Sequence, residues 1–268
     1  QTIDQHQSWG HSVLIKQGFE LEKVLPNLFN KPKYAGYGKN DLAVEATEIS
    51  KKLFEKSNVN FLKKKVTKLI FEKNKVKGVQ TGDEKIYADE VILATGLGTP
   101  EILESININF IMRSSLGILA YTNPLPPLLN HPITGIDFHV RQDSQGRLVI
   151  GGRFDDDATK ENDLAASAKM LVNEMVSMIN FDGEVSLDHY TVGNRPLPID
   201  GRPKIGRLKN SVGEIIKGVY IAVMHSGVTN APIAGKLGIE EIISGKQDRI
   251  LNTFSPQMNR NNQENSDV

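Results

Sequence analysis

The chain has 268 residues, which is enough for one large domain or two small ones. Lys plus Arg equals Asp plus Glu at 32 each, so no net field attracts nucleic acid or an anionic membrane. Cysteine is absent, which excludes disulfides, cysteine-ligated zinc and iron–sulfur clusters. No apolar run reaches the length of a transmembrane segment and no signal peptide is visible, so we expect a cytoplasmic protein.

The first half of the chain predicts two helices followed by a β-meander. A short helix over residues 19–26 is expected to stop at Pro26, because proline cannot continue a helix. Apolar residues at helical spacing predict a second helix that has Asn40 as its N-cap and ends near residue 56. Runs of β-branched and aromatic residues then predict strands over residues 59–62, 66–71, 76–80, 85–87 and 90–96.

The second half predicts further strands around one long helix. An apolar stripe at helical spacing indicates that helix over residues 164–178. The tail over residues 257–268 is polar and rich in Asn, Gln and Ser, which predicts disorder. Strands are expected over residues 136–141, 147–152, 185–192 and 218–223.

The turn after the last predicted strand is the most informative stretch. It reads His-Ser-Gly-Val-Thr-Asn-Ala-Pro over residues 225–232 and opens a helix, with Thr229 or Asn230 as the expected N-cap and Pro232 in the first turn. Gly227 lets the backbone approach a ligand closely, because glycine has no Cβ. A helix N-terminus presents free N–H groups and partial positive charge, so this turn predicts a site for an anionic ligand.

Two stretches resemble motifs of one family. The turn at residues 225–232 resembles the closing flavin motif of the D-amino-acid-oxidase-like FAD-dependent oxidoreductases, which include glycine oxidase and sarcosine oxidase. Residues 195–206 read Arg-Pro-Leu-Pro-Ile-Asp-Gly-Arg-Pro-Lys-Ile-Gly, and they resemble the Arg-Pro-x-x-x-Asp-Gly-x-Pro-x-Ile-Gly signature of the same family. The resemblance covers about residues 40–255 and implies FAD as the cofactor.

The resemblance implies a mixed α/β (α+β) fold, in which a Rossmann-like FAD-binding domain is interleaved with an antiparallel-sheet substrate domain. The family's opening Gly-x-Gly-x-x-Gly turn, which holds the FAD pyrophosphate, is absent from the sequence. We therefore expect an N-terminally incomplete FAD domain, whose first βαβ unit comes from a missing N-terminal segment or from a partner chain. The expected FAD-binding domain comprises residues 40–105 and 196–256, and the expected substrate domain comprises residues 1–39 and 106–195.

Family position implies FAD contacts at four places in the chain. Thr95 and Gly96, at the end of a predicted buried strand, are expected near the FAD phosphates. Val66 is expected to contact the adenine through its backbone, and Gly206 is expected to permit close backbone approach to the flavin. The remaining expected contacts lie on the closing turn, at His225, Ser226, Gly227, Val228 and Thr229.

Four side chains are candidates for catalysis. In amino-acid oxidases of this family the residue that matches Arg195 anchors the substrate carboxylate, which a guanidinium fork can hold in two parallel bonds; a structural Arg paired with an acid is the alternative. His225 could polarise the flavin and His139 could face it, although a structural role is equally open for each. Tyr121 is a candidate because its hydroxyl can orient an amine. His189 could line the pocket.

The sequence therefore predicts an FAD-dependent oxidoreductase that oxidises the C–N bond of an amine or amino acid by hydride transfer to flavin N5. Its partners would be a small-molecule substrate and no nucleic acid, and no metal-ligand spacing occurs. Three alternatives stay open: a 2-hydroxy acid or a modified tRNA nucleoside as the substrate, a catalytic subunit completed by a partner chain, or a flavin-free fragment that acts as an interaction module. The neutral charge argues against the RNA substrate.

Overall fold

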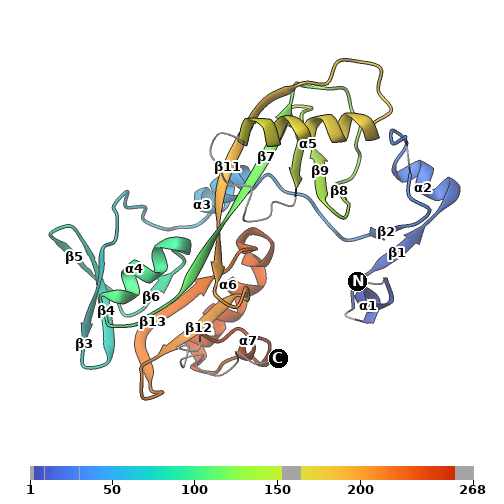
Figure 1. Cartoon of the computed structure of the whole chain (residues 1–268). Helices are drawn as coiled ribbons and strands as arrows, with labels where there is room; N and C mark the ends of the chain where they lie inside the picture. The colour runs from blue at the N-terminus through green and yellow to red at the C-terminus, as the bar shows by residue number, and fades with distance from the viewer. Residues whose placement is uncertain (1–2, 9, 30, 153–163, 257–268) are drawn as a thin grey trace, which may run out of the picture. The chain divides into compact units, whose positions relative to one another are not determined.

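The computed structural model describes residues 3–8, 10–29, 31–152 and 164–256. The predicted disorder of residues 257–268 lies outside the described residues. The chain forms two compact units (Figure 1), and we call them unit 1 and unit 2. Unit 1 comprises residues 1–58 and 116–193, and unit 2 comprises residues 59–115 and 194–268. The assignment of residues to a flavin domain and a substrate domain stays a prediction.

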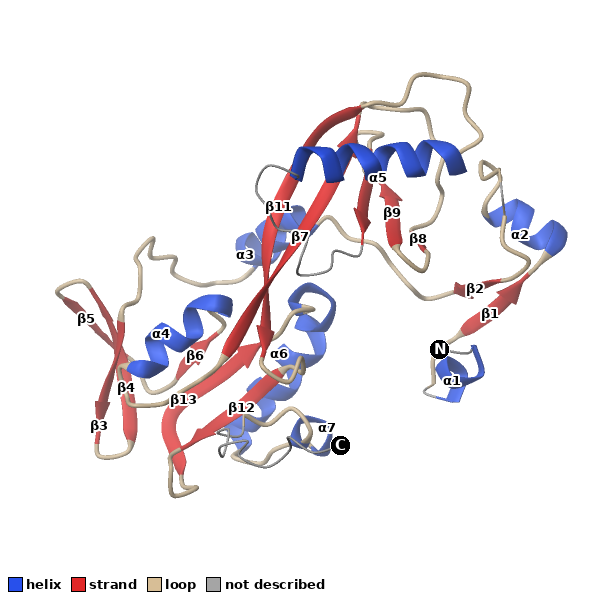
Figure 2. Cartoon of the chain, in the orientation of Figure 1, coloured by secondary structure: helices blue, strands red, loops and turns tan. Residues whose placement is uncertain are grey.

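Unit 2 is built on a six-stranded sheet in the order β12-β13-β4-β3, with β5 paired to β4 and β6 paired to β13 (Figure 2). Strands β6 and β13 run parallel, whereas β12 runs antiparallel to β13. The elements of this unit are β3 (Lys68–Glu72), β4 (Lys75–Thr81), β5 (Glu84–Tyr87), β6 (Val91–Leu93), η1 (Gly96–Gly98), α4 (Thr99–Glu104), β12 (Lys204–Lys209), β13 (Ile215–Val223), α6 (Gly227–Ser244) and α7 (Arg249–Asn252).

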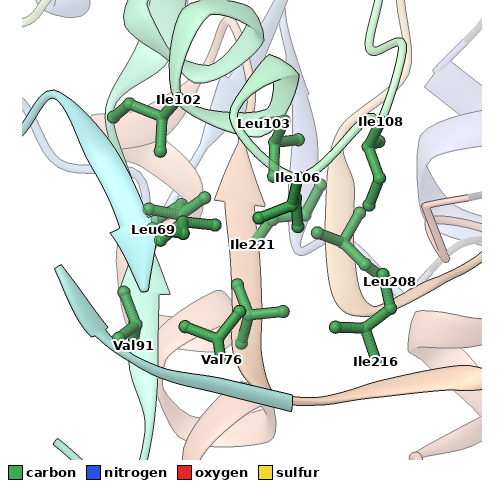
Figure 3. Close-up of a cluster of buried hydrophobic side chains, with 12 residues drawn as sticks. Leu69, Val76, Val91, Ile102, Leu103, Ile106, Ile108, Leu208, Ile216 and Ile221 are labelled. Carbon is green, nitrogen blue, oxygen red and sulfur yellow. The ribbon is translucent and has the colours of Figure 1, made fainter. Parts of the chain in front are cut away.

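An apolar core joins the strands of unit 2 to helix α4. Ile102 and Leu103 of α4 point toward Ile221 and Leu69 on the sheet (Figure 3). Leu103 and Val76 are fully buried, and burying an aliphatic side chain of this size contributes about 1.5–3 kcal/mol to folding. Helix α4 is not predicted from the sequence, because its apolar face is too short to show a helical period.

One glycine shapes the course of β13 beside β4. Gly218 has a φ of +75°, and a Cβ at this position would lie 2.1 Å from the carbonyl oxygen of Val76. No side chain fits there, since the obstacle is backbone rather than a movable side chain.

Unit 1 contains the two-stranded sheet β1-β2 and part of a five-stranded sheet in the order β11-β7-β10-β9-β8. Strands β7 and β11 begin in one unit and end in the other. The elements are α1 (Ile3–Ser8), β1 (Val13–Lys16), α2 (Gly18–Val24), β2 (Ala35–Gly38), α3 (Ala46–Lys56), β7 (Met112–Thr122), β8 (Ile133–Thr134), β9 (Phe138–Gln142), β10 (Leu148–Gly152), α5 (Leu164–Met178) and β11 (Leu187–Pro198).

The five-stranded sheet has one face covered by α5. Leu171 and Met175 of α5 form a buried cluster with Ile118, Ala120 and Ile150 of the sheet. Alternation along the strands therefore places residues such as Tyr121 on the opposite face. This is the face that carries the candidate polar side chains of unit 1.

Two predicted elements differ from the structure. Residues 59–62 form no strand, and Phe61 is 70% exposed, because no described strand pairs with this segment. The helix predicted from Asn40 begins instead at Ala46, after Glu45 in extended conformation, so Asn40 is not its N-cap. The other predicted helices and strands are present, with their ends shifted by a few residues.

Candidate functional site

Unit 2 contains an apolar cavity of about 370 Å³ beside its parallel strands. Ala94 and Gly96, just after β6, line one side, and Met224 and Gly227, just after β13, line another. Ala231 of α6 also lines the cavity. In parallel α/β sheets ligands bind at the carboxyl ends of the strands. The cavity includes the ends of β6 and β13 and continues along α6 as far as Ile242.

Helix α6 begins earlier than the sequence predicts. Its first residue is Gly227 and its N-cap position is Ser226, so Thr229 and Asn230 are inside the helix and neither is the cap. The Asn230 amide donates a 2.9 Å hydrogen bond to the Ser226 hydroxyl instead. Pro232 lies in the second turn and not in the first. The first N–H groups of the helix have no partner within it, and Gly227 brings this end of the helix to the cavity.

The predicted residues at the end of β6 form a tight turn. Gly96 has a φ of +53° and lines the cavity, and Pro196 is the side chain nearest to the position of its missing Cβ, at 3.7 Å. The Thr95 hydroxyl lies 2.8 Å from that of Thr99, which is fully buried. This bond fixes the turn from β6 into α4, with Gly96 at the cavity.

Other predicted cofactor residues do not line the cavity. Val66 packs against the apolar core just before β3. Gly206, at a φ of +141°, faces Gln247 and Pro256, which lie 3.0 and 3.1 Å from the position that a Cβ would take. The segment that lies closest to Gly206 is therefore the C-terminal part of the same chain. His225, Val228 and Thr229 are exposed on the turn and first turn of α6.

Arg195 lies within β11, three residues before the strand ends. Its neighbour Pro196 lines the cavity, whereas Arg195 itself is not among the lining residues. The guanidinium is half-buried, and it has no ion pair or hydrogen bond with any of the described residues. An Arg that pairs with no acid among the residues that the structure describes is proposed below as a partner for an anionic ligand.

In unit 1 the cross-strand register brings Tyr121 and His139 to one sheet face. Val149 pairs with Tyr121 on one side and with Arg141 on the other, while Gly151 pairs with His139. Directly opposed residues share a face, so all of these lie opposite α5. Arg141 is neutralised by Glu45 through two hydrogen bonds of 3.2 and 3.1 Å.

His139 lies directly over Gly151. A Cβ added at Gly151 would be 2.2 Å from Cε1 of the imidazole and 3.0 Å from Leu119 Cδ2. The absence of a side chain at Gly151 therefore makes the space that the His139 ring fills.

Sequence reasoning missed residues that shape the cavity. Tyr220 lines it, and the Tyr220 hydroxyl hydrogen-bonds Glu241 of α6. Burial, together with the Glu241 carboxylate, raises the pKa of Tyr220 above its ordinary value.

Three small residues, Gly227, Ala231 and Gly235, recur every four positions on α6 and line the cavity. That spacing in the sequence could have indicated a helix face close to a ligand or another backbone.

A family model described as FAD dependent oxidoreductase (DAO) matches residues 4–240. The chain belongs to this family. The predicted family and the predicted mixed fold are confirmed, and the family is one of FAD-dependent oxidoreductases. Within the described part of the chain, no three His, Asp or Glu side chains gather to hold a metal ion, and no helix has the length and apolarity needed to cross a membrane.

The chain is also similar to one curated oxidoreductase and to several solved structures. The uncharacterized oxidoreductase YurR of Bacillus subtilis (strain 168) is 25% identical over 197 residues, which are 70% of this chain and 51% of YurR. The chain thus spans about half the length of that relative. Glycine oxidase from Bacillus cereus ATCC 14579 superposes with a TM-score of 0.75 at 21% identity, covering 95% of this chain and 71% of that one.

Two further structures share the fold. L-proline dehydrogenase from P. horikoshii has a TM-score of 0.74 at 18% identity, with 95% of this chain and 70% of that chain covered. L-amino acid deaminase from Proteus vulgaris, with its specific insertion deleted, has a TM-score of 0.76 at 17% identity, with 94% and 67% covered. At these identities the likeness establishes the fold of this DAO-family chain and not its substrate.

Proposed function

We propose that the protein binds FAD and oxidises the C–N bond of an amine or amino acid. The observation that carries this proposal is the cavity at the carboxyl ends of β6 and β13, which the N-terminus of α6 borders. The named structural neighbours are enzymes of glycine, proline and L-amino acids, which supports this substrate class over a 2-hydroxy acid. When bound, FAD supplies the acceptor for the hydride that leaves the α-carbon, and the resulting imine hydrolyses to a keto acid or aldehyde.

The residues around the cavity fit the flavin end of FAD. Gly96 and Gly227 present backbone without side chains, and the lining is otherwise apolar, which excludes water from a planar ring system. The unpaired N–H groups at the start of α6 favour negative charge there, which suits a reduced flavin anion.

Arg195 is the residue proposed to hold the substrate carboxylate. Its guanidinium has no ion pair among the described residues and can form two parallel bonds to a carboxylate. Holding the carboxylate fixes the α-carbon, and no protein base is needed if the bound amine is neutral. His225 and Thr229, exposed at the start of α6, are proposed as contacts of the cofactor.

We further propose that a βαβ unit with a glycine-rich turn completes the cofactor site. Strand β6 pairs with β13 on one side, and no described strand pairs with its other side. Ile92 of β6 is 47% exposed and lines the cavity, so this edge offers both backbone hydrogen bonds and apolar surface to an additional strand. The glycine-rich turn that would hold the pyrophosphate is absent from this sequence.

The first test measures flavin binding with and without such a unit. We expect the visible flavin spectrum to stay with the chain through gel filtration once a βαβ unit is supplied, in the same chain or as a second chain. Retention of FAD by the chain alone would contradict the need for this unit. Absence of flavin under every condition would contradict the enzymatic proposal and favour an interaction module.

The second test addresses the substrate. The flavin-loaded enzyme should produce a keto acid together with ammonia from amino acids, whereas a keto acid without ammonia would indicate a 2-hydroxy acid. Arg195→Gln should raise KM for amino acids by about 10- to 100-fold, as expected for loss of a charge-assisted hydrogen bond of about 1.5–3 kcal/mol. Arg202→Gln is the matched control, since Arg202 is exposed in the same motif. Equal KM values for both variants would remove Arg195 from the site.

A further inference from the structure

Strand β6 is covered on one face and open on the other. Val91 and Leu93 are buried in the core that includes α4, whereas Ile92, which points to the opposite face, is 47% exposed. Strands of parallel sheets are buried on both faces, because their crossover helices cover both. The second face of β6 therefore lacks a covering element among the residues that the structure describes.

Helix α6 leaves an apolar line of residues uncovered beside that open face. The buried side of the helix packs on Ile205 of β12 and Tyr220 of β13. Next to it runs a second line, in which apolar residues follow one another at spacings of four, four and three along the helix. These residues are Ala231, Gly235, Ile239 and Ile242, and all of them line the cavity.

The cavity is therefore also a groove between two uncovered apolar surfaces. Ile92 of β6 lines it together with Ile239 and Ile242 of α6, and its lining contains no charged side chain. Ile242 lies fifteen residues beyond Gly227, which corresponds to about 22 Å along the helix. A planar ring held at the N-terminus of α6 thus leaves the distant part of the groove uncovered.

The unpaired edge of β6 indicates which kind of element covers the groove. A strand added in parallel to this edge needs a crossover connection of a dozen or more residues to the next parallel strand, usually a helix. That helix packs on a face of the sheet. The α4 side of β6 is already covered, so the open side, which carries Ile92 and borders α6, is the one available to it.

We propose that the groove between α6 and β6 is the docking surface for the helix of the βαβ unit that completes the cofactor site. This inference rests on the proposed function, because the completing unit is proposed there. An amphipathic helix docks by laying its apolar face into such a groove. The flavin end of FAD keeps the other part of the cavity, at Gly96 and Gly227.

The absence of cysteine from the sequence allows a direct test, because one substitution introduces a unique thiol. Ile239→Cys reports on the groove, where the Ile239 side chain is 45% exposed. Ile233→Cys is the matched control, since Ile233 is 46% exposed and does not line the groove. The two positions lie about 120° apart around the helix.

The probe is the opening Gly-x-Gly-x-x-Gly βαβ segment of a DAO-family glycine oxidase, co-expressed with the chain. Modification of each thiol by a maleimide is timed in the chain alone, with FAD alone, and with the probe bound. In the chain alone the two thiols should react at similar rates, because the two positions are equally exposed. With the probe bound, Ile239→Cys should react about tenfold more slowly and Ile233→Cys should keep its rate.

A second pair of variants measures binding of the probe itself. Ile239→Asp should weaken binding about tenfold, because docking of an apolar helix would bury an unpaired carboxylate. Ile233→Asp should leave binding unchanged, because that position faces away from the groove.

The outcomes separate this inference from the proposed function. Equal rates for both thiols with the probe bound overturn the docking surface, while retention of FAD by the complex keeps the proposed function. Protection of Ile239→Cys by FAD alone, or by a higher concentration of the chain alone, also overturns it, because the cofactor or a second copy would then fill the groove. Protection by the probe in a complex that retains no FAD supports the docking surface while the flavin proposal fails. A probe that does not co-purify with the chain contradicts the completing unit and this inference together.

Discussion

The hydroxyl of Tyr220 donates a 2.8 Å hydrogen bond to the carboxylate of Glu241, and both residues are almost fully buried. This bond joins β13 to α6, the two elements whose junction forms the end of the cavity. Gly238 makes room for it, since a Cβ there would lie 3.2 Å from the Tyr220 ring. The pair therefore fixes α6 on the sheet and with it the position of the helix N-terminus.

Tyr220→Phe should destabilise the chain by about 1.5–3 kcal/mol, because the buried Glu241 carboxylate loses its hydrogen-bond donor. Urea unfolding measures the difference. Glu241→Gln retains an acceptor for the Tyr220 hydroxyl and should cost less. A Tyr220→Phe variant as stable as the wild type would mean that the bond does not hold α6 in place.

The Asp143 carboxylate should make stability depend on pH in the acid range. Burial acts to raise its pKa, but hydrogen bonds from the Arg147 backbone and guanidinium and from the Gln145 N–H outweigh burial and lower it. The folded pKa thus lies below the unfolded value of about 3.9, so the contribution is complete above that pH and is lost as the pH falls through the folded pKa.

Unfolding midpoints of the wild type and Asp143→Asn at pH 5 and near pH 2.5 check this behaviour. The wild type should be the more stable protein at pH 5, and the gap should narrow at the lower pH. Asp200 also has a lowered pKa, so only the difference between the two proteins is informative. A gap that is constant over this range would show that Asp143 does not carry the effect.

Gly151→Ala should displace the exposed His139 ring and destabilise unit 1 by no more than about 1 kcal/mol, because the nearest atoms belong to side chains that can move. Chemical denaturation measures the loss, and the NMR signal of the His139 ring reports the displacement. Gly193→Ala is the matched control, because nothing lies within 4 Å of a Cβ at Gly193. If both variants unfold at the same denaturant concentration, the space between Gly151 and the His139 ring can accept a Cβ without loss of stability, and the prediction is wrong.

Much of the fold could be read from the sequence because local patterns and tertiary packing agree there. The stripe over residues 164–178 became α5, which buries that stripe against the sheet. The pattern over residues 59–62 is equally strand-like, but a strand needs a neighbour, and no described strand provides one. Sequence reasoning detects the propensity of a segment and not the presence of its partner.

The predicted glycines lie in two different kinds of surroundings. Gly96 and Gly227 were expected at the ligand, and both line the cavity. Gly206 was expected at the flavin for the same reason, yet it faces Pro256 of the same chain. A glycine in a sequence predicts that something approaches closely, but only the fold determines what approaches. The contacts of Tyr121 with His189 depend on strand register, which the sequence does not specify.

Gly235 offers a test of the cavity that separates stability from binding. It lies inside α6, lines the cavity and has nothing within 4 Å of a Cβ position. Gly235→Ala should therefore stabilise the chain by roughly 0.5–1 kcal/mol, since glycine in a helix interior costs about that much.

Gly235→Phe should fill part of the cavity and weaken FAD retention in the presence of the completing βαβ unit. Lys236→Ala, at the next and exposed position, should leave flavin retention unchanged. Undiminished FAD retention by Gly235→Phe would place the cofactor outside this cavity.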